Sequence, residues 1–140
     1  MRLALFAVLL LLSAPPSERE KHQGTWSVVS FVREGKATSR EIVDSIERIV
    51  EGDHVVWKRN GKSFAGTTMK LDPATVPASI DLIPDGGPDR EKIVRGIYKI
   101  EGDILTLCTS DPDKSRPQGF KAGAGSGQTL MTFRRARAGK

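Results

Sequence analysis

The stretch that decides the fold is KHQGTWSVVS, residues 21–30, where Gly24 and Trp26 stand at the start of the first strand-like segment. That segment runs over residues 25–33, and its alternation places on one face Trp26, Val28, Ser30 and Val32. An indole buries about 200 Å² of apolar surface in a core, so a Trp at the start of the first strand is expected to have a structural role. We expect Trp26 to close one end of a β-structure, with Gly24 letting the backbone pass close by.

Strand-like segments follow one another through most of the remaining chain. Besides residues 25–33, the patterns predict strands over residues 47–51, 54–59, 62–71, 78–83, 92–100, 104–109 and 128–135. Asn60-Gly61 predicts a type I′ hairpin turn, because both central residues of that turn need a positive φ. The one helical pattern lies over residues 40–48, with Ser39 as its expected N-cap.

These patterns predict an all-β fold. An eight-stranded antiparallel up-and-down lipocalin-like barrel, with one short helix between strands 1 and 2, would close its own edges. A two-sheet sandwich is the alternative. In a barrel, an Arg near the end of the last strand would lie over the ring of Trp26. Arg134 and Arg135 are both candidates, and alternation with Met131 and Phe133 favours Arg135.

The N-terminal segment has the order of a secretory signal peptide. Residues 1–14, MRLALFAVLLLLSA, hold a charge, then an apolar run, then small residues. The apolar run is shorter than the roughly 20 residues that span a bilayer, so no transmembrane span is expected in the mature chain. A buried N-terminal strand or helix is the alternative. We expect an exported protein, periplasmic or extracellular, with a flexible leader over 15–22, a barrel domain over 23–136 and a tail over 137–140.

Charge and residue chemistry argue against several classes of function. The formal net charge of +5 is spread along the chain, and the basic runs Lys58-Arg59 and Arg134–Arg137 are not the dense stripe expected for nucleic-acid binding. The single Cys108 lies in an apolar strand and is expected to pack as a small hydrophobe. His22 and His54 are far apart without converging partners, so no metal or other cofactor is expected. No Ser or Cys has a His at a suggestive spacing, which predicts that the protein is not an enzyme.

Gly24-x-Trp26 on the first strand and an Arg at the end of the last resemble the structural signature of the lipocalin and fatty-acid-binding-protein superfamily. More narrowly, the sequence is similar to a family of exported lipocalin-like domains abundant in planctomycete bacteria. The similar stretches, which span about residues 22–136, are QGTWSVVS, IVEGDHVVWKRNGK, KLDPATVPASIDL, RGIYKIEGDILTLC, SRPQGF and LMTFRR. The Gly-rich KAGAGSGQ after SRPQGF departs from that pattern. The resemblance implies a lipocalin-like barrel and brings no established ligand, activity or catalytic residue.

The remaining hypothesis is a binding function. We expect a small apolar or amphipathic ligand inside the barrel or at its mouth, where it would contact Trp57, Phe64, Arg95, Tyr98 and Arg116. The residues expected to close the barrel are Gly24, Trp26 and Arg135. The alternative is a protein-interaction or structural module of the cell envelope, with the barrel filled by its own side chains. The oligomeric state and the identity of a ligand stay open.

Overall fold

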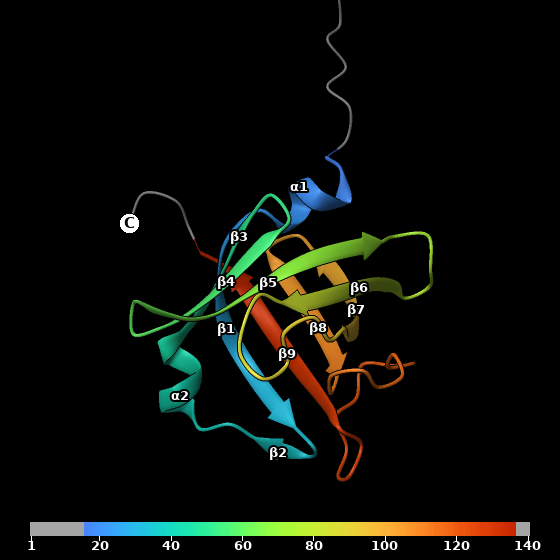
Figure 1. The fold of residues 1–140 in the computed structure, drawn as a ribbon. Coiled ribbons are helices and arrows are strands. Elements are labelled where there is room, and N and C mark those ends of the chain that lie inside the picture. The colour runs from blue at the N-terminus through green and yellow to red at the C-terminus, as the bar shows by residue number, and fades with distance from the viewer. Residues whose placement is uncertain (1–15, 137–140) are drawn as a thin grey trace, which may run out of the picture.

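Successive strands pair side by side along the chain, and the last pairs with the first, so the sheet closes into an eight-stranded antiparallel barrel (Figure 1). In this computed structural model, which describes residues 16–136, the barrel strands are β1 (Gly24–Arg33), β3 (Ile46–Glu51), β4 (His54–Arg59), β5 (Lys62–Asp72), β6 (Ala78–Pro84), β7 (Val94–Glu101), β8 (Ile104–Ser110) and β9 (Gln128–Arg135). A two-residue strand, β2 (Lys36–Ala37), pairs with the end of β1. The barrel predicted from the sequence is confirmed, and the sandwich is not formed.

Tight turns join the central hairpins. Asn60 and Gly61, between β4 and β5, have φ values of 50° and 78°, as the predicted type I′ turn requires. Alternate residues of each strand then face the barrel axis and pack together. The buried core consists of Trp26, Val28, Val43, Val50, Val55, Met69, Ile80, Leu82, Tyr98, Leu105, Leu107, Met131 and Phe133.

A bulge in β1 changes which of its residues face the interior. The pairing of β1 with β9 shifts between Val28 and Ser30, so the inward positions move by one residue. Phe31 packs against the core, while Ser30 is exposed. The prediction that Ser30 and Val32 continue the face of Trp26 is therefore wrong, although Val28 lies on that face as predicted.

The helix between the first barrel strands, α2 (Arg40–Ser45), is shorter than the sequence predicts. The expected helix over 40–48 ends at Ser45, and Ile46 already has an extended backbone with φ −103° and ψ 134°. Residues 46–51 instead form β3, which pairs with both β1 and β4. Pairing on two sides outweighs the local helical spacing, and Arg48 becomes an inward residue of the barrel.

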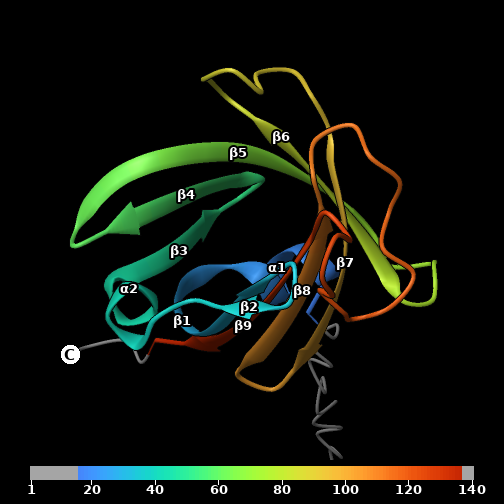
Figure 2. The ribbon, with the colours of Figure 1, turned by 90° about the horizontal axis from the view of Figure 1, so that it is seen from below.

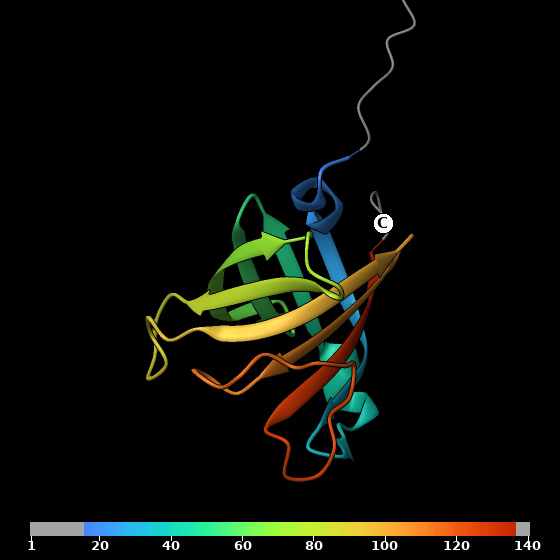
Figure 3. The same ribbon diagram turned by 90° about the vertical axis from the view of Figure 1, so that its right-hand side faces the viewer.

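A second helix, α1 (Glu18–His22), forms where the sequence predicts a flexible leader over 15–22. The Ser17 side chain caps it by accepting a hydrogen bond from the Glu20 backbone N–H at 3.1 Å. In Figures 1 and 3, α1 and α2 lie at opposite ends of the barrel. α1 is held by its contacts with the barrel strands, and a local sequence pattern cannot predict such distant contacts.

Several sequence-based expectations concern the ends of the chain. The predicted signal peptide, residues 1–14, and the predicted tail, residues 137–140, lie outside the described residues. Within residues 16–136, no helix has the length and apolar character needed to cross a membrane.

The seam between β1 and β9 closes the barrel and carries the aromatic–cation pair expected from the sequence. Trp26 is fully buried and pairs across the seam with Arg135. The Arg135 guanidinium, rather than that of Arg134, lies over the indole at 4.1 Å from the ring centroid. The indole Nε1 donates to the His22 carbonyl at 2.9 Å. Gly24 has a φ of +108°, a conformation that a residue with a Cβ rarely adopts.

Replacement of Trp26 by Ala is expected to lower the free energy of unfolding by about 3–5 kcal/mol, because it empties a large aromatic site in the core. Urea denaturation followed by circular dichroism measures the change. Phe64→Ala is the matched control, since the Phe64 side chain is 58% exposed, and is expected to cost less than about 1 kcal/mol. Equal effects of the two substitutions would contradict the assignment of Trp26 as the closing residue.

Candidate functional site

α1 closes one end of the barrel, and two further contacts fix it there. The Arg135 guanidinium, already stacked on Trp26, donates to the carbonyl of Lys21 at 2.7 Å and to that of Gln23 at 2.5 Å. The Gln23 side-chain amide exchanges two hydrogen bonds with the backbone of Gly52, in the β3–β4 hairpin, at 2.7 and 2.9 Å. The helix is thus attached to the first and last strands and to a hairpin at the same time.

His22, the last residue of α1, lies buried against the barrel interior and not in the flexible leader that the sequence predicts. It is 0% exposed, and neither ring nitrogen has a hydrogen-bond partner among the described residues. Its ring meets that of Tyr98 edge-on, with centroids 4.7 Å apart. Burial and the charges of Arg48 and Arg135 lower the pKa of His22 to about 4, against the opposing effect of Glu18. His22 is therefore neutral at pH 7.

Tyr98 connects the closed end to α1. Its hydroxyl donates to Glu18 Oε2 at 2.8 Å. Burial, followed by the hydrogen bond and charge of Glu18, raises the pKa of Tyr98 above its ordinary value. Hydrogen bonds from Lys21 and then Tyr98 lower the pKa of Glu18. The phenol therefore stays neutral and serves as a donor at neutral pH.

The other end of the barrel, which carries α2 and β2 and faces the viewer in Figure 2, contains a cavity of about 640 Å³. Its walls come from six strands and their ends, and the residues that line it are Phe31, Ile46, Trp57, Arg59, Phe64, Ala65, Thr109, Thr129 and Met131. Most of these side chains are apolar, with two threonines and one arginine among them. The cavity can therefore hold an apolar group and still offer polar contacts at its rim.

The structure separates the five residues predicted to contact a ligand. Trp57 and Phe64 line the cavity. Tyr98 faces the barrel interior but lies at the closed end, where it packs on His22. Strand alternation identified these inward positions, whereas which end of the barrel is closed depends on α1.

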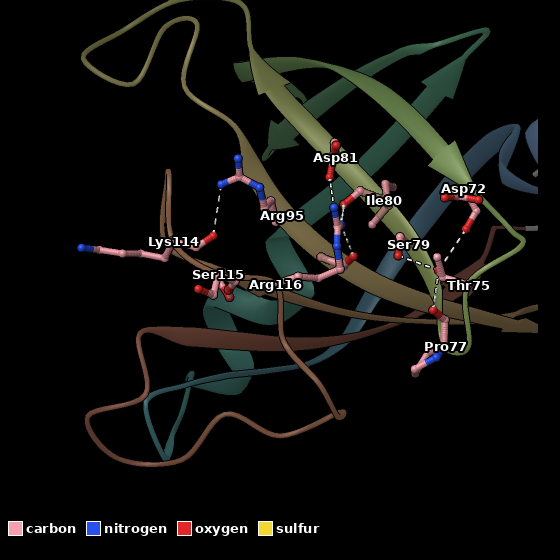
Figure 4. A network of polar contacts seen from close by, with 12 residues as sticks. Asp72, Thr75, Pro77, Ser79, Ile80, Asp81, Arg95, Lys114, Ser115 and Arg116 are labelled. Carbon is pink, nitrogen blue, oxygen red and sulfur yellow. Dashed lines mark hydrogen bonds and ion pairs between the residues drawn. The ribbon is translucent and has the colours of Figure 1, made fainter.

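Arg95 and Arg116 lie on the outer face of the barrel, on β7 and on the loop after β8 (Figure 4). The Arg116 guanidinium binds Asp81 of β6 at 2.7 Å and donates to the carbonyls of Ile80 and Gly96 at 3.0 and 2.8 Å. Arg95 donates to a loop carbonyl at 3.3 Å. Arg116 therefore anchors the β8–β9 loop against β6 and β7, away from the cavity.

The same long loop, residues 111–127, covers part of the outer face of the barrel sheet. Ala122 and Cys108 are both buried, and the thiol of Cys108 donates to the Lys121 carbonyl at 3.3 Å. Burial raises the pKa of this thiol, so Cys108 packs as a small hydrophobic residue. A hollow of about 880 Å³ along this loop is lined mainly by polar and charged residues such as Glu34, Asp111 and Lys114.

Arg48 is the residue that sequence reasoning missed. It is 0% exposed inside the barrel, and its Nε, Nη1 and Nη2 atoms have no hydrogen-bond partner among the described residues. Its guanidinium lies 5.8 Å from the centroid of the Phe133 ring. The alternation of Ile46, Arg48 and Val50 on one strand face, with a charge between two apolar residues, was the available signal. A helical reading of residues 40–48 concealed it.

Comparisons with known proteins add no assignment. No protein-family model matches the sequence, and no curated protein matches it. Among residues 16–136, no three His, Cys, Asp or Glu side chains are grouped as metal ligands. The closed eight-stranded barrel is consistent with a lipocalin-like fold.

Acidification from pH 7 to pH 5 is expected to destabilise the fold through His22. Because its folded-state pKa of about 4 lies below the ordinary value of 6.5, the unfolded chain gains the proton first as the pH falls. The free energy of unfolding begins to fall near pH 6.5, is lower by about 2 kcal/mol at pH 5 and levels off below pH 4. Urea midpoints measured across this range test it. His22→Phe should flatten the profile between pH 7 and pH 5, and an unchanged slope in that variant would rule out His22 as the cause.

Proposed function

We propose that this protein is an exported lipocalin-like binding protein, of the family abundant in planctomycete bacteria, and that it holds a small apolar or amphipathic ligand in the open half of its barrel. The observation that carries the proposal is the cavity of about 640 Å³ with its largely apolar wall. Pockets for small molecules typically have volumes of about 300–1,000 Å³ and predominantly apolar walls with a few polar groups. The size and the lining of this cavity both match that description.

The closed end supports the same function. Trp26 and Phe133 are completely buried, and α1 covers the barrel beyond them. A ligand would enter from the α2 end and meet a dry floor rather than a channel. Water displaced from apolar walls in such a pocket favours binding in proportion to the apolar area covered.

Two other functions fit the site less well. An interaction or structural module of the cell envelope would be favoured by a barrel filled with its own side chains, whereas the cavity occupies its open half. A catalytic function would place groups with perturbed pKa values in the cavity. The groups whose pKa values are shifted chiefly by burial are His22, Arg48, Tyr98 and Cys108, and none of them lines the cavity. The proposal therefore includes binding and no chemical step.

Titration with the neutral apolar dye N-phenyl-1-naphthylamine tests the proposal. The dye is expected to bind saturably with one site and an increase in fluorescence. Phe64→Asp introduces a charge at the cavity wall and is expected to weaken dye binding about tenfold, because a carboxylate next to an apolar ligand is desolvated. Val76→Asp makes the same charge change at a side chain that is 98% exposed in the β5–β6 loop, away from the cavity wall.

The Val76→Asp variant should bind the dye as the unmodified protein does. No saturable binding to the unmodified protein, or equal weakening by the two Asp substitutions, would refute a ligand site at this position.

A further inference from the structure

Arg48 is unlike the other arginines of the closed and outer faces of the barrel. Arg116 and Arg135 each donate to backbone carbonyls and pair with a carboxylate, on Asp81 and Asp103 respectively. Arg48 makes no such contact within the described residues, although its side chain is completely buried. A guanidinium has five N–H donors and is almost always provided with acceptors when it leaves water. The guanidinium of Arg48 is therefore a buried donor group without an acceptor among the described residues.

The position of Arg48 is next to the cavity. On β3, Arg48 is the next inward residue after Ile46. It is the cross-strand partner of Trp57 on β4. Ile46 and Trp57 both line the cavity. Its guanidinium faces Phe133, whose ring lies 5.8 Å from that of Trp57. Arg48 thus occupies the layer directly behind the cavity wall, between the hollow half and the closed end.

The charge of Arg48 is present at neutral pH. Burial lowers its pKa to about 10, which still leaves the guanidinium protonated at pH 7. The aromatic ring of Phe133 offers a weak cation–π contact and no acceptor for the N–H groups. His22 is neutral there and is itself without a partner. Neither neighbour compensates the buried charge.

We propose that Arg48 binds the anionic head, a carboxylate or a similar oxyanion, of the ligand that occupies the barrel. This inference rests on the proposed function and names the ligand class: an amphipathic acid whose apolar part fills the cavity. The planar guanidinium fork matches the two oxygens of a carboxylate, and a charge-assisted pair in a dry interior is strong. The acid reaches Arg48 when side chains of the wall move, and Met131 is unbranched and well suited to such adjustment.

Displacement of N-phenyl-1-naphthylamine by decanoate and by decanol, at pH 7.5, tests the inference. The two competitors share a ten-carbon chain and differ in the charge of the head. The unmodified protein is expected to prefer decanoate by about tenfold or more. In Arg48→Met, which keeps an unbranched apolar stem and removes the guanidinium with its charge, that ratio is expected to fall severalfold, with only the exposed Arg59 of the cavity lining left to favour the acid.

Arg90→Met is the matched control, since Arg90 is exposed in the β6–β7 loop, and it should retain the full preference. Arg48→Lys keeps the charge without the fork and is expected to give an intermediate ratio. The melting midpoint of ligand-free Arg48→Met should rise, because an unpartnered buried charge has been removed. A folded Arg48→Met with the preference intact would overturn the inference.

The outcomes separate this inference from the proposed function. If both competitors displace the dye equally from the unmodified protein, the barrel binds ligands and Arg48 does not select an acid. If the dye does not bind, the melting midpoint of the unmodified protein is compared between sodium acetate and sodium chloride at equal ionic strength. A rise that Arg48→Met abolishes would support an anion site for a free small carboxylate. No rise with acetate or decanoate would overturn the inference.

Discussion

The stack of Arg135 on Trp26 is the interaction on which the rest of the barrel depends. These residues face each other across the seam where β9 meets β1, so their contact forms only when the sheet has closed. The same guanidinium donates to the carbonyls of Lys21 and Gln23 and thereby holds α1 over the end of the barrel. Strand closure and helix docking are in this way coupled through one side chain, and the cation is oriented by hydrogen bonds as well as by the ring.

This closure divides the interior into two halves with different physical properties. Beneath α1, Trp26, His22 and Tyr98 pack closely and exclude water. Toward α2, the walls separate and leave the cavity. Arg48 lies where the two halves meet, beside its cross-strand partner Trp57 of β4. Because this packing also shields Arg48 from solvent, the guanidinium is not hydrated. An anion at that position would therefore interact with it more strongly than in water.

Local patterns predicted the strands, the Asn60-Gly61 turn and the position of Arg135 because each depends on neighbouring residues in sequence or on strand alternation. Strand alternation also identified Trp57 as an inward residue of the cavity. The misses depend on distant contacts. α1 has no apolar periodicity and is held by Arg135 and Gly52, far along the chain. Arg116 was expected at the barrel mouth, but the fold of its long loop places it on the outer face against Asp81.

Arg48 was missed for a different reason, and the reason bears on its role. Its strand carries an apolar inward face that a Met or Leu would complete, and a buried charge without a partner destabilises a fold by about 3–5 kcal/mol. Core packing therefore accounts for Ile46 and Val50 but not for the charge between them. A residue that reduces stability at the edge of a cavity is typical of a functional site. The proposed amphipathic acid would account for both features, because its chain would cover the apolar wall and its head would supply the acceptor that Arg48 lacks among the described residues.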